Sequence, residues 1–152
     1  MNTIPFELPG FRIQAIDVHD QTLVIRAQSI ATKSCCPDCG TPSSRVHSSY
    51  TRSPRDIPCN GRAVQLVLGV RRFRCLNAYC PRTTFAERLP HLVPLRGQRT
   101  HRLTNVLREI AFALGGEAGQ RIQVHLRMNW SADTLLRITR ATPLDAVRAP
   151  TV

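Results

Sequence analysis

Six cysteines carry the clearest chemical signal in this chain of 152 residues. Two residues separate Cys36 from Cys39, four separate Cys75 from Cys80, and a hairpin-sized insert joins the two pairs. Zinc in structural sites prefers four ligands at tetrahedral corners, and two short cysteine knuckles can supply four thiolates. The spacing therefore predicts that Cys36, Cys39, Cys75 and Cys80 bind one structural zinc ion.

The residues around the first pair favour zinc over unrelated thiols or a redox pair. Pro37 presets φ for a tight turn, and Gly40 permits unusual backbone geometry after the second thiolate. Because sulfur fills all four coordination positions, no position remains for a reacting water, so the site is predicted to be structural and not catalytic. Cys35 and Cys59 are left over and are expected to be buried or incidental thiols.

Strands are predicted before and between the cysteine pairs. Apolar and polar residues alternate over 11–18, and a second strand over 22–27 completes a β-hairpin. Within the insert, 45–50 is a short strand, 53–61 must turn because of its prolines and Asn-Gly, and 63–75 is the clearest strand. The face of that last strand predicted to be apolar comprises Val64, Leu66, Leu68 and Val70.

Helices are predicted after a linker at 91–98, where the apolar period changes from two to about 3.6. Thr100 can cap the first helix, and the glycines at 115–116 end it. A second helix is expected over 117–126, and Ser131 caps a third that runs through about residue 140.

The predicted fold class is α+β, in which a small β-hairpin and zinc-ribbon module precedes an all-α, three-helix helix-turn-helix module. The predicted boundaries are 1–90 for the hairpin and ribbon, 91–98 for the linker, 99–142 for the helices and 143–152 for a tail.

Charge points to a polyanionic partner. The net charge is +11, from 21 basic and 10 acidic residues, and this favours nucleic acid. Lys33 is the only lysine, so codon usage in a GC-rich genome can explain the excess of arginine but not the scarcity of acids. The N-terminus has no signal-peptide pattern and no apolar run reaches membrane-spanning length, so a cytoplasmic protein without a membrane partner is expected.

Double-stranded DNA is the expected partner, contacted in two places. Arginine guanidinium groups match phosphate geometry, whereas the N-terminal end of a recognition helix can read bases in the major groove. On the third helix, Leu135 and Ile138 are expected to face inward, and Thr134 and Arg137 outward. A solvated basic surface and a helical bundle that binds no DNA remain the alternatives. The predicted DNA-binding residues are Arg45, Arg71, Arg72, Arg74, Arg82, Ser131, Thr134, Arg137 and Arg140.

Nothing in the sequence predicts an enzyme. The acidic residues are scattered, and no three of them fall on strands as a two-metal phosphoryl-transfer site requires. A glycine-rich phosphate loop and a nucleophile elbow are both absent.

Several runs together resemble the N-terminal region of ISL-three family insertion-sequence transposases. They are CPDCG from Cys36, RDIP from Arg55, VRRFRC from Val70, CPRTTFAER from Cys80, LGGEAG from Leu114 and SADTLLR from Ser131. The resemblance implies a zinc finger and a helix-turn-helix that bind the terminal inverted repeats of a mobile element. It also implies an RNase H-like domain with an Asp-Asp-Glu triad, which this sequence is expected to lack. Arg127 departs from the family, which commonly has a turn glycine there.

The expected function is therefore DNA recognition in DNA transposition, in the bacterial cytoplasm on the nucleoid. Three alternatives remain open: a fragment of a full transposase, a stand-alone regulator of transposition or transcription, and a ribbon that binds proteins. A homodimer is also left open.

Overall fold

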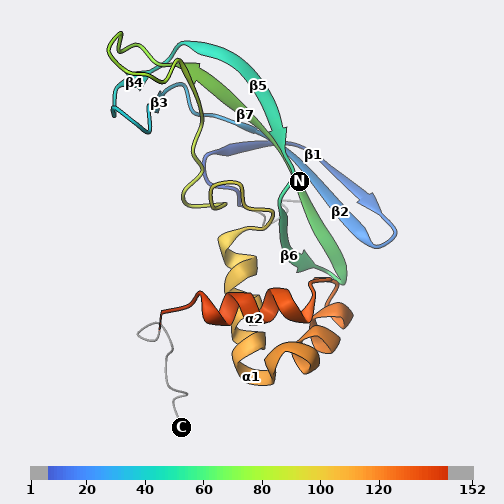
Figure 1. Cartoon of the computed structure of the whole chain (residues 1–152). Helices are drawn as coiled ribbons and strands as arrows, with labels where there is room; N and C mark the ends of the chain where they lie inside the picture. Colours follow the sequence, from blue (N-terminus) through green and yellow to red (C-terminus); the bar gives the residue numbers. More distant parts are fainter. Residues whose placement is uncertain (1–6, 144–152) are drawn as a thin grey trace.

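The computed structural model describes residues 7–143, so most of the predicted tail lies outside the described residues. Strands fill the first part of the chain and helices the second (Figure 1). The strands are β1 (Phe11–His19), β2 (Thr22–Ser29), β3 (Ser34–Cys35), β4 (Pro42–Ser43), β5 (Val46–Arg52), β6 (Arg55–Cys59), β7 (Arg62–Arg74) and β8 (Thr84–Ala86). The helices are α1 (His101–His125) and α2 (Ala132–Arg140).

Strand β7 is the centre of a six-stranded mixed sheet. Its first half pairs in parallel with β2, from Thr22 opposite Ala63 to Gln28 opposite Gly69, and antiparallel with β6. Its second half pairs antiparallel with β5 and β8, while β1 extends the sheet beyond β2. One strand thus runs from the helices at one end to the small β3–β4 hairpin at the other (Figure 1).

The predicted fold class is wrong. The hairpin β1–β2 is not a separate extension, because its parallel pairing with β7 merges it with the ribbon into one large sheet. The described residues contain two helices, and no all-α three-helix module is present. The first two predicted helices are the two segments of α1, which meet at a kink where Gly115 is non-helical (φ 76°, ψ −169°), so the predicted break at this glycine is present. Among residues 7–143, neither helix has the length and hydropathy to cross a membrane.

The main core covers one face of the sheet. The alternation predicted for β7 is confirmed, since Val64, Leu66, Leu68 and Val70 are all buried there. Residues 91–98, predicted as a linker, contribute Leu92 and Val93 to this core. These apolar side chains leave water as they pack on the sheet, which fixes the segment that leads into α1.

A second core holds the two helices together. Leu103, Leu107 and Ala111 of α1 pack with Leu135 and Ile138 of α2. Glycine allows the close approach, because a Cβ at Gly119 would lie 3.0 Å from a methyl carbon of Leu135. The predicted inward positions on α2 are therefore confirmed.

Asp56 of β6 joins the sheet to the start of α1. Its side chain is fully buried and accepts hydrogen bonds from the Thr100 hydroxyl at 2.7 Å, the Ile57 amide at 2.9 Å and Arg102 Nε at 2.7 Å. The Thr100 hydroxyl in turn accepts from the Leu103 amide and caps α1, as predicted. One carboxylate therefore fixes both the helix N-terminus and its position against the sheet.

Candidate metal centre and nucleic-acid interface

The four predicted zinc ligands lie together at the far end of the sheet from the helices. The Sγ atoms of Cys36, Cys39, Cys75 and Cys80 are all within 4.8 Å of one another. Two of the separations are 3.9 Å, between Cys36 and Cys80, and 3.6 Å, between Cys39 and Cys75. Zinc–sulfur bonds of about 2.3 Å place the corners of a tetrahedron about 3.8 Å apart, so the cluster fits zinc. The separations are far longer than the roughly 2.05 Å of a disulfide.

Two backbone turns aim the thiols at a common point. In the first, the Gly40 amide donates to the Cys36 carbonyl at 2.9 Å, with Gly40 at φ 72°, which is the role predicted for this glycine. In the second, the Cys75 amide at the end of β7 donates to the Thr83 carbonyl at 2.9 Å. The knuckles are therefore held by the small hairpin and by the end of the central strand.

A small apolar cluster supports the metal site. Phe73 and Phe85 are both buried, and their rings stack with centroids 6.0 Å apart. Cys36 completes this cluster, and Cys75 and Cys80 pack against it. Phe73 lies on the face of β7 opposite to the main core, so the ribbon has its own minimal core and depends on metal for the rest of its stability.

The thiols need a cation between them. Hydrogen bonding with the side chain and backbone of Thr41 lowers the pKa of Cys39 to about 6. A backbone hydrogen bond from Asn77 lowers the pKa of Cys75, but desolvation and the other three sulfur atoms outweigh it and raise this pKa to about 12. Four thiolates this close repel one another, and a divalent ion bound among them removes the conflict. One structural zinc ion fits the site.

Cys35 and Cys59 lie outside the cluster. Both are exposed free thiols, Cys35 on β3 and Cys59 at the end of β6. They are not among the four clustered residues, which agrees with their predicted exclusion from the ligand set.

Arg82, predicted to contact DNA, bridges the two knuckles. Its Nε donates to Asp38 at 2.7 Å, and this hydrogen bond raises the pKa of Arg82. Both side chains are about two-fifths exposed, so water screens the pair strongly. We expect Arg82→Gln to retain a full equivalent of zinc in elemental analysis; loss of the metal would show that the ion pair holds the knuckles in place.

The predicted arginines of the ribbon do not share one surface. Arg72 is exposed, lies over the Tyr50 ring with its guanidinium carbon 5.4 Å from the centroid, and lines a cleft of about 910 Å³. Arg71 faces away from that cleft, and its guanidinium donates to the Ala31 carbonyl. Arg45 and Arg74 are exposed beside the ribbon.

The cleft beside Arg72 is strongly basic. Five arginines and His101 line it, whereas Glu87 is the only acidic lining residue. Glu87 is buried and already accepts hydrogen bonds from the Ser29 hydroxyl and the Arg71 amide. Only two of the five arginines were predicted as DNA contacts; the full set is Arg52, Arg72, Arg82, Arg88 and Arg96.

The residues predicted on the recognition helix now lie on α2 and its cap. Ser131 caps the helix by accepting from the Thr134 amide at 3.2 Å. The prediction that Thr134 faces outward is wrong: Thr134 is buried, and its hydroxyl lies 3.0 Å from the Ser131 hydroxyl. Arg137 and Arg140 are exposed, as a DNA contact requires.

Comparison with known proteins bears on the ribbon. Residues 32–80 match a family described as the zinc-finger of transposase IS204/IS1001/IS1096/IS1165. No curated protein and no solved structure gives a significant match. The matched segment contains all four clustered cysteines, so it confirms the ribbon part of the resemblance. The helices lie outside the matched residues. This chain therefore carries a transposase-type zinc ribbon, a non-catalytic module with one structural zinc.

Proposed function

We propose that this protein binds double-stranded DNA through the basic cleft, as the recognition part of a transposition system of the ISL-three type. The observation that carries the proposal is the cleft itself, where five arginines surround a hollow whose one carboxylate is internally hydrogen-bonded. Such a surface attracts a polyanion, and arginine guanidinium groups bind phosphate oxygens in pairs. The terminal inverted repeats of a mobile element are the proposed target, and the bacterial nucleoid the proposed location.

Two regions would contact the DNA: the basic cleft and helix α2. The cleft lies between the ribbon and the segment leading into α1, so its arginines are suited to hold the phosphate backbone. On α2, Arg137 and Arg140 are exposed and are available for the base edges or the backbone. Zinc takes no chemical part; it fixes the end of β7 that carries Arg72 and Arg74.

Binding should be strongly salt-dependent and should weaken when the cleft loses charge. Each phosphate contact contributes about −0.9 to the slope of log affinity against log salt. We expect the double variant Arg72→Gln/Arg88→Gln to reduce that slope by about 1.8, measured by fluorescence anisotropy with a labelled duplex. Neither residue forms an ion pair within residues 7–143, so the fold should survive.

Arg12→Gln is the control for the two single substitutions, Arg72→Gln and Arg88→Gln, because it removes one positive charge, as each of them does, from an exposed position on β1 outside the cleft. Its slope should equal that of the unmodified protein. Equal slopes for the cleft variant and the unmodified protein would contradict the proposal. Sequence specificity is a separate question: at about 150 mM salt, equal affinity for inverted-repeat and scrambled duplexes would exclude recognition of the repeats.

A further inference from the structure

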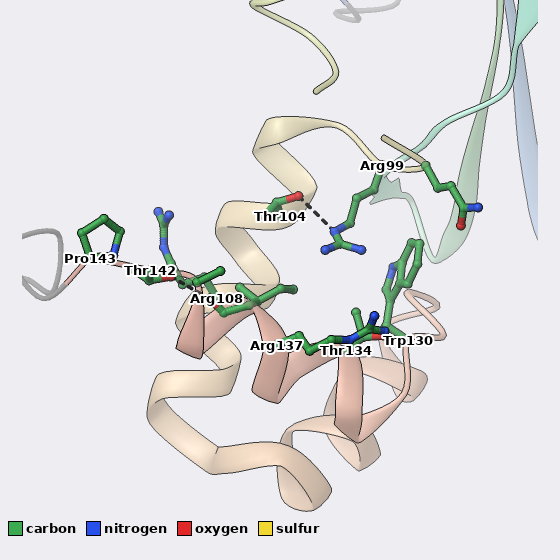
Figure 2. Close-up of a pocket in the computed structure, with 11 residues that line it drawn as sticks. Arg99, Thr104, Arg108, Trp130, Thr134, Arg137, Thr142 and Pro143 are labelled. Carbon is green, nitrogen blue, oxygen red and sulfur yellow. Dashed lines mark hydrogen bonds between the residues drawn. The ribbon is translucent and has the colours of Figure 1, made fainter. Parts of the chain in front are cut away.

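A second basic hollow lies on the helical side of the molecule, away from the ribbon. It has a volume of about 680 Å³, within the usual range of ligand pockets. Figure 2 shows it bounded by α1, α2 and the segment before α1. Three arginines from separate parts of the chain line it together with Trp130: Arg99, Arg108 and Arg137.

Arg99 is the best placed of the three to receive an anion. It makes no ion pair with any described residue, and its Nε donates to the Thr104 hydroxyl at 3.1 Å. Burial, and then the nearby charge of Arg137, lower the pKa of Arg99. The Arg99 guanidinium is thus partly buried beside a second positive charge, an unfavourable environment that a bound anion would relieve.

The ion pairs near the hollow do not cancel its attraction for an anion. Arg137 pairs with Asp133 at 3.1 Å, but both side chains are more than two-thirds exposed and the pair is screened. The Nε atom of Arg108 lies 3.8 Å from Oε1 of Glu109, at the upper limit for an ion pair. No acidic residue lines the hollow itself.

Trp130 argues for phosphate over a stacked base. The guanidinium carbon of Arg99 lies 4.9 Å from the centre of its ring, and that of Arg55 lies 5.9 Å away. The ring is therefore already engaged by cations. Its indole N–H is buried and has no hydrogen-bond partner among the described residues, so one donor of a residue that lines the hollow is unused.

We propose that the hollow formed by Arg99, Arg108, Arg137 and Trp130 is a phosphate-binding pocket that anchors the DNA backbone beside α2. The inference rests on the proposed function and deepens it. Because the anchoring residues come from the segment before α1 and from both helices, the pocket would fix the orientation of α2 on the duplex. Free phosphate and backbone phosphate share this chemistry, and the two are separated by experiment.

Trp130 is the only tryptophan in the chain, so its fluorescence reports on this pocket alone. In the zinc-loaded protein at constant ionic strength, inorganic phosphate should change its emission along a saturable curve. Arg108→Gln should weaken that response at least several-fold, whereas Arg12→Gln should leave it unchanged. Arg99→Lys, which keeps the charge, should retain more of the response than Arg99→Gln, and thermal melting checks that each variant is folded.

The second experiment measures the binding of the same variants to duplex DNA. Arg108→Gln should reduce the salt slope of DNA binding by about 0.9, the contribution of one phosphate contact. If the unmodified protein binds DNA and Arg108→Gln and Arg99→Gln bind with the same slope and affinity, the inference is overturned while the proposed function stands. If phosphate is bound but DNA is not, the proposed function fails, and with it the assignment of the pocket to the DNA backbone.

Discussion

Replacing Cys36 with serine should abolish zinc binding and unfold the ribbon end of the sheet. Cys36 is the buried member of the cluster, and its neighbours Phe73 and Phe85 form too small a core to hold the knuckles alone. Structural zinc in small zinc-finger peptides contributes an apparent free energy of about 10–16 kcal/mol at neutral pH, which is folding free energy. Elemental analysis should fall from about one zinc per chain to none, and amide hydrogen exchange should rise at β3, β4 and β8.

Cys35→Ser is the matched control, since Cys35 adjoins Cys36 but lies outside the cluster. It should keep one zinc and unchanged protection. Chelation of the unmodified protein should reproduce the Cys36→Ser result. A Cys36→Ser protein with a full equivalent of zinc, or with normal protection around the knuckles, would contradict the assigned ligand set.

Replacing Asp56 with asparagine should uncouple the helices from the sheet. The buried carboxylate accepts from Thr100, Ile57 and Arg102 Nε through Oδ1 and from Arg102 Nη2 through Oδ2, where asparagine would place an NH2 group that cannot accept. Breaking a buried ion pair costs about 3–5 kcal/mol. Arg102 is 43% exposed and can be solvated, so we expect the lower half of that range or somewhat less, about 2–4 kcal/mol. Urea denaturation of the zinc-loaded protein measures this loss.

Asp17→Asn provides the comparison, because Asp17 pairs with Arg26 at 3.0 Å on the surface, where the two side chains are 42% and 53% exposed. That change should alter stability by less than about 1 kcal/mol. Hydrogen exchange in Asp56→Asn should rise first at the start of α1. Equal effects of the two substitutions would show that the Asp56 contacts do not hold α1 against the sheet.

The metal site could be predicted from sequence because its ligands come in local pairs. Each knuckle is fixed by a few neighbouring residues, such as Pro37 and Gly40, and the spacing alone specifies the geometry. Strand β7 could also be predicted from sequence, since the alternation of its apolar residues indicates which face is buried. Both features depend on residues that are close together in the sequence, so both could be predicted from local patterns.

The sheet topology could not be predicted in the same way. Parallel pairing of β2 with β7 joins strands about forty residues apart, and no turn between neighbours specifies it. The role of Asp56 was hidden for the same reason: its partners Thr100 and Arg102 lie 44 and 46 residues away. Both basic hollows are likewise assembled from distant segments, which is why Arg96 and Arg99 are not among the predicted DNA contacts.

The break predicted at Gly115–Gly116 is present as a kink within α1. The pair Gly115–Gly116 is a strong stop signal, and Gly115 does leave the helical conformation. A second helical segment begins directly after this kink, and its Gly116 and Gly119 approach Leu136 and Leu135 of α2 closely. The glycine pair therefore marks the break correctly, and what it does not show is that the second helical segment follows without an intervening loop.

The central claim is that zinc organises a ribbon whose basic cleft binds DNA. Its most direct test compares the salt dependence of duplex binding by the zinc-loaded and the zinc-free protein. If Arg72, Arg82, Arg88 and Arg96 each contact a phosphate, the cleft alone should contribute about −3.6 to the slope of the zinc-loaded protein, about −0.9 for each contact, and the zinc-free protein should give a clearly shallower slope. A flat dependence for the zinc-loaded protein, or identical slopes with and without zinc, would contradict the account.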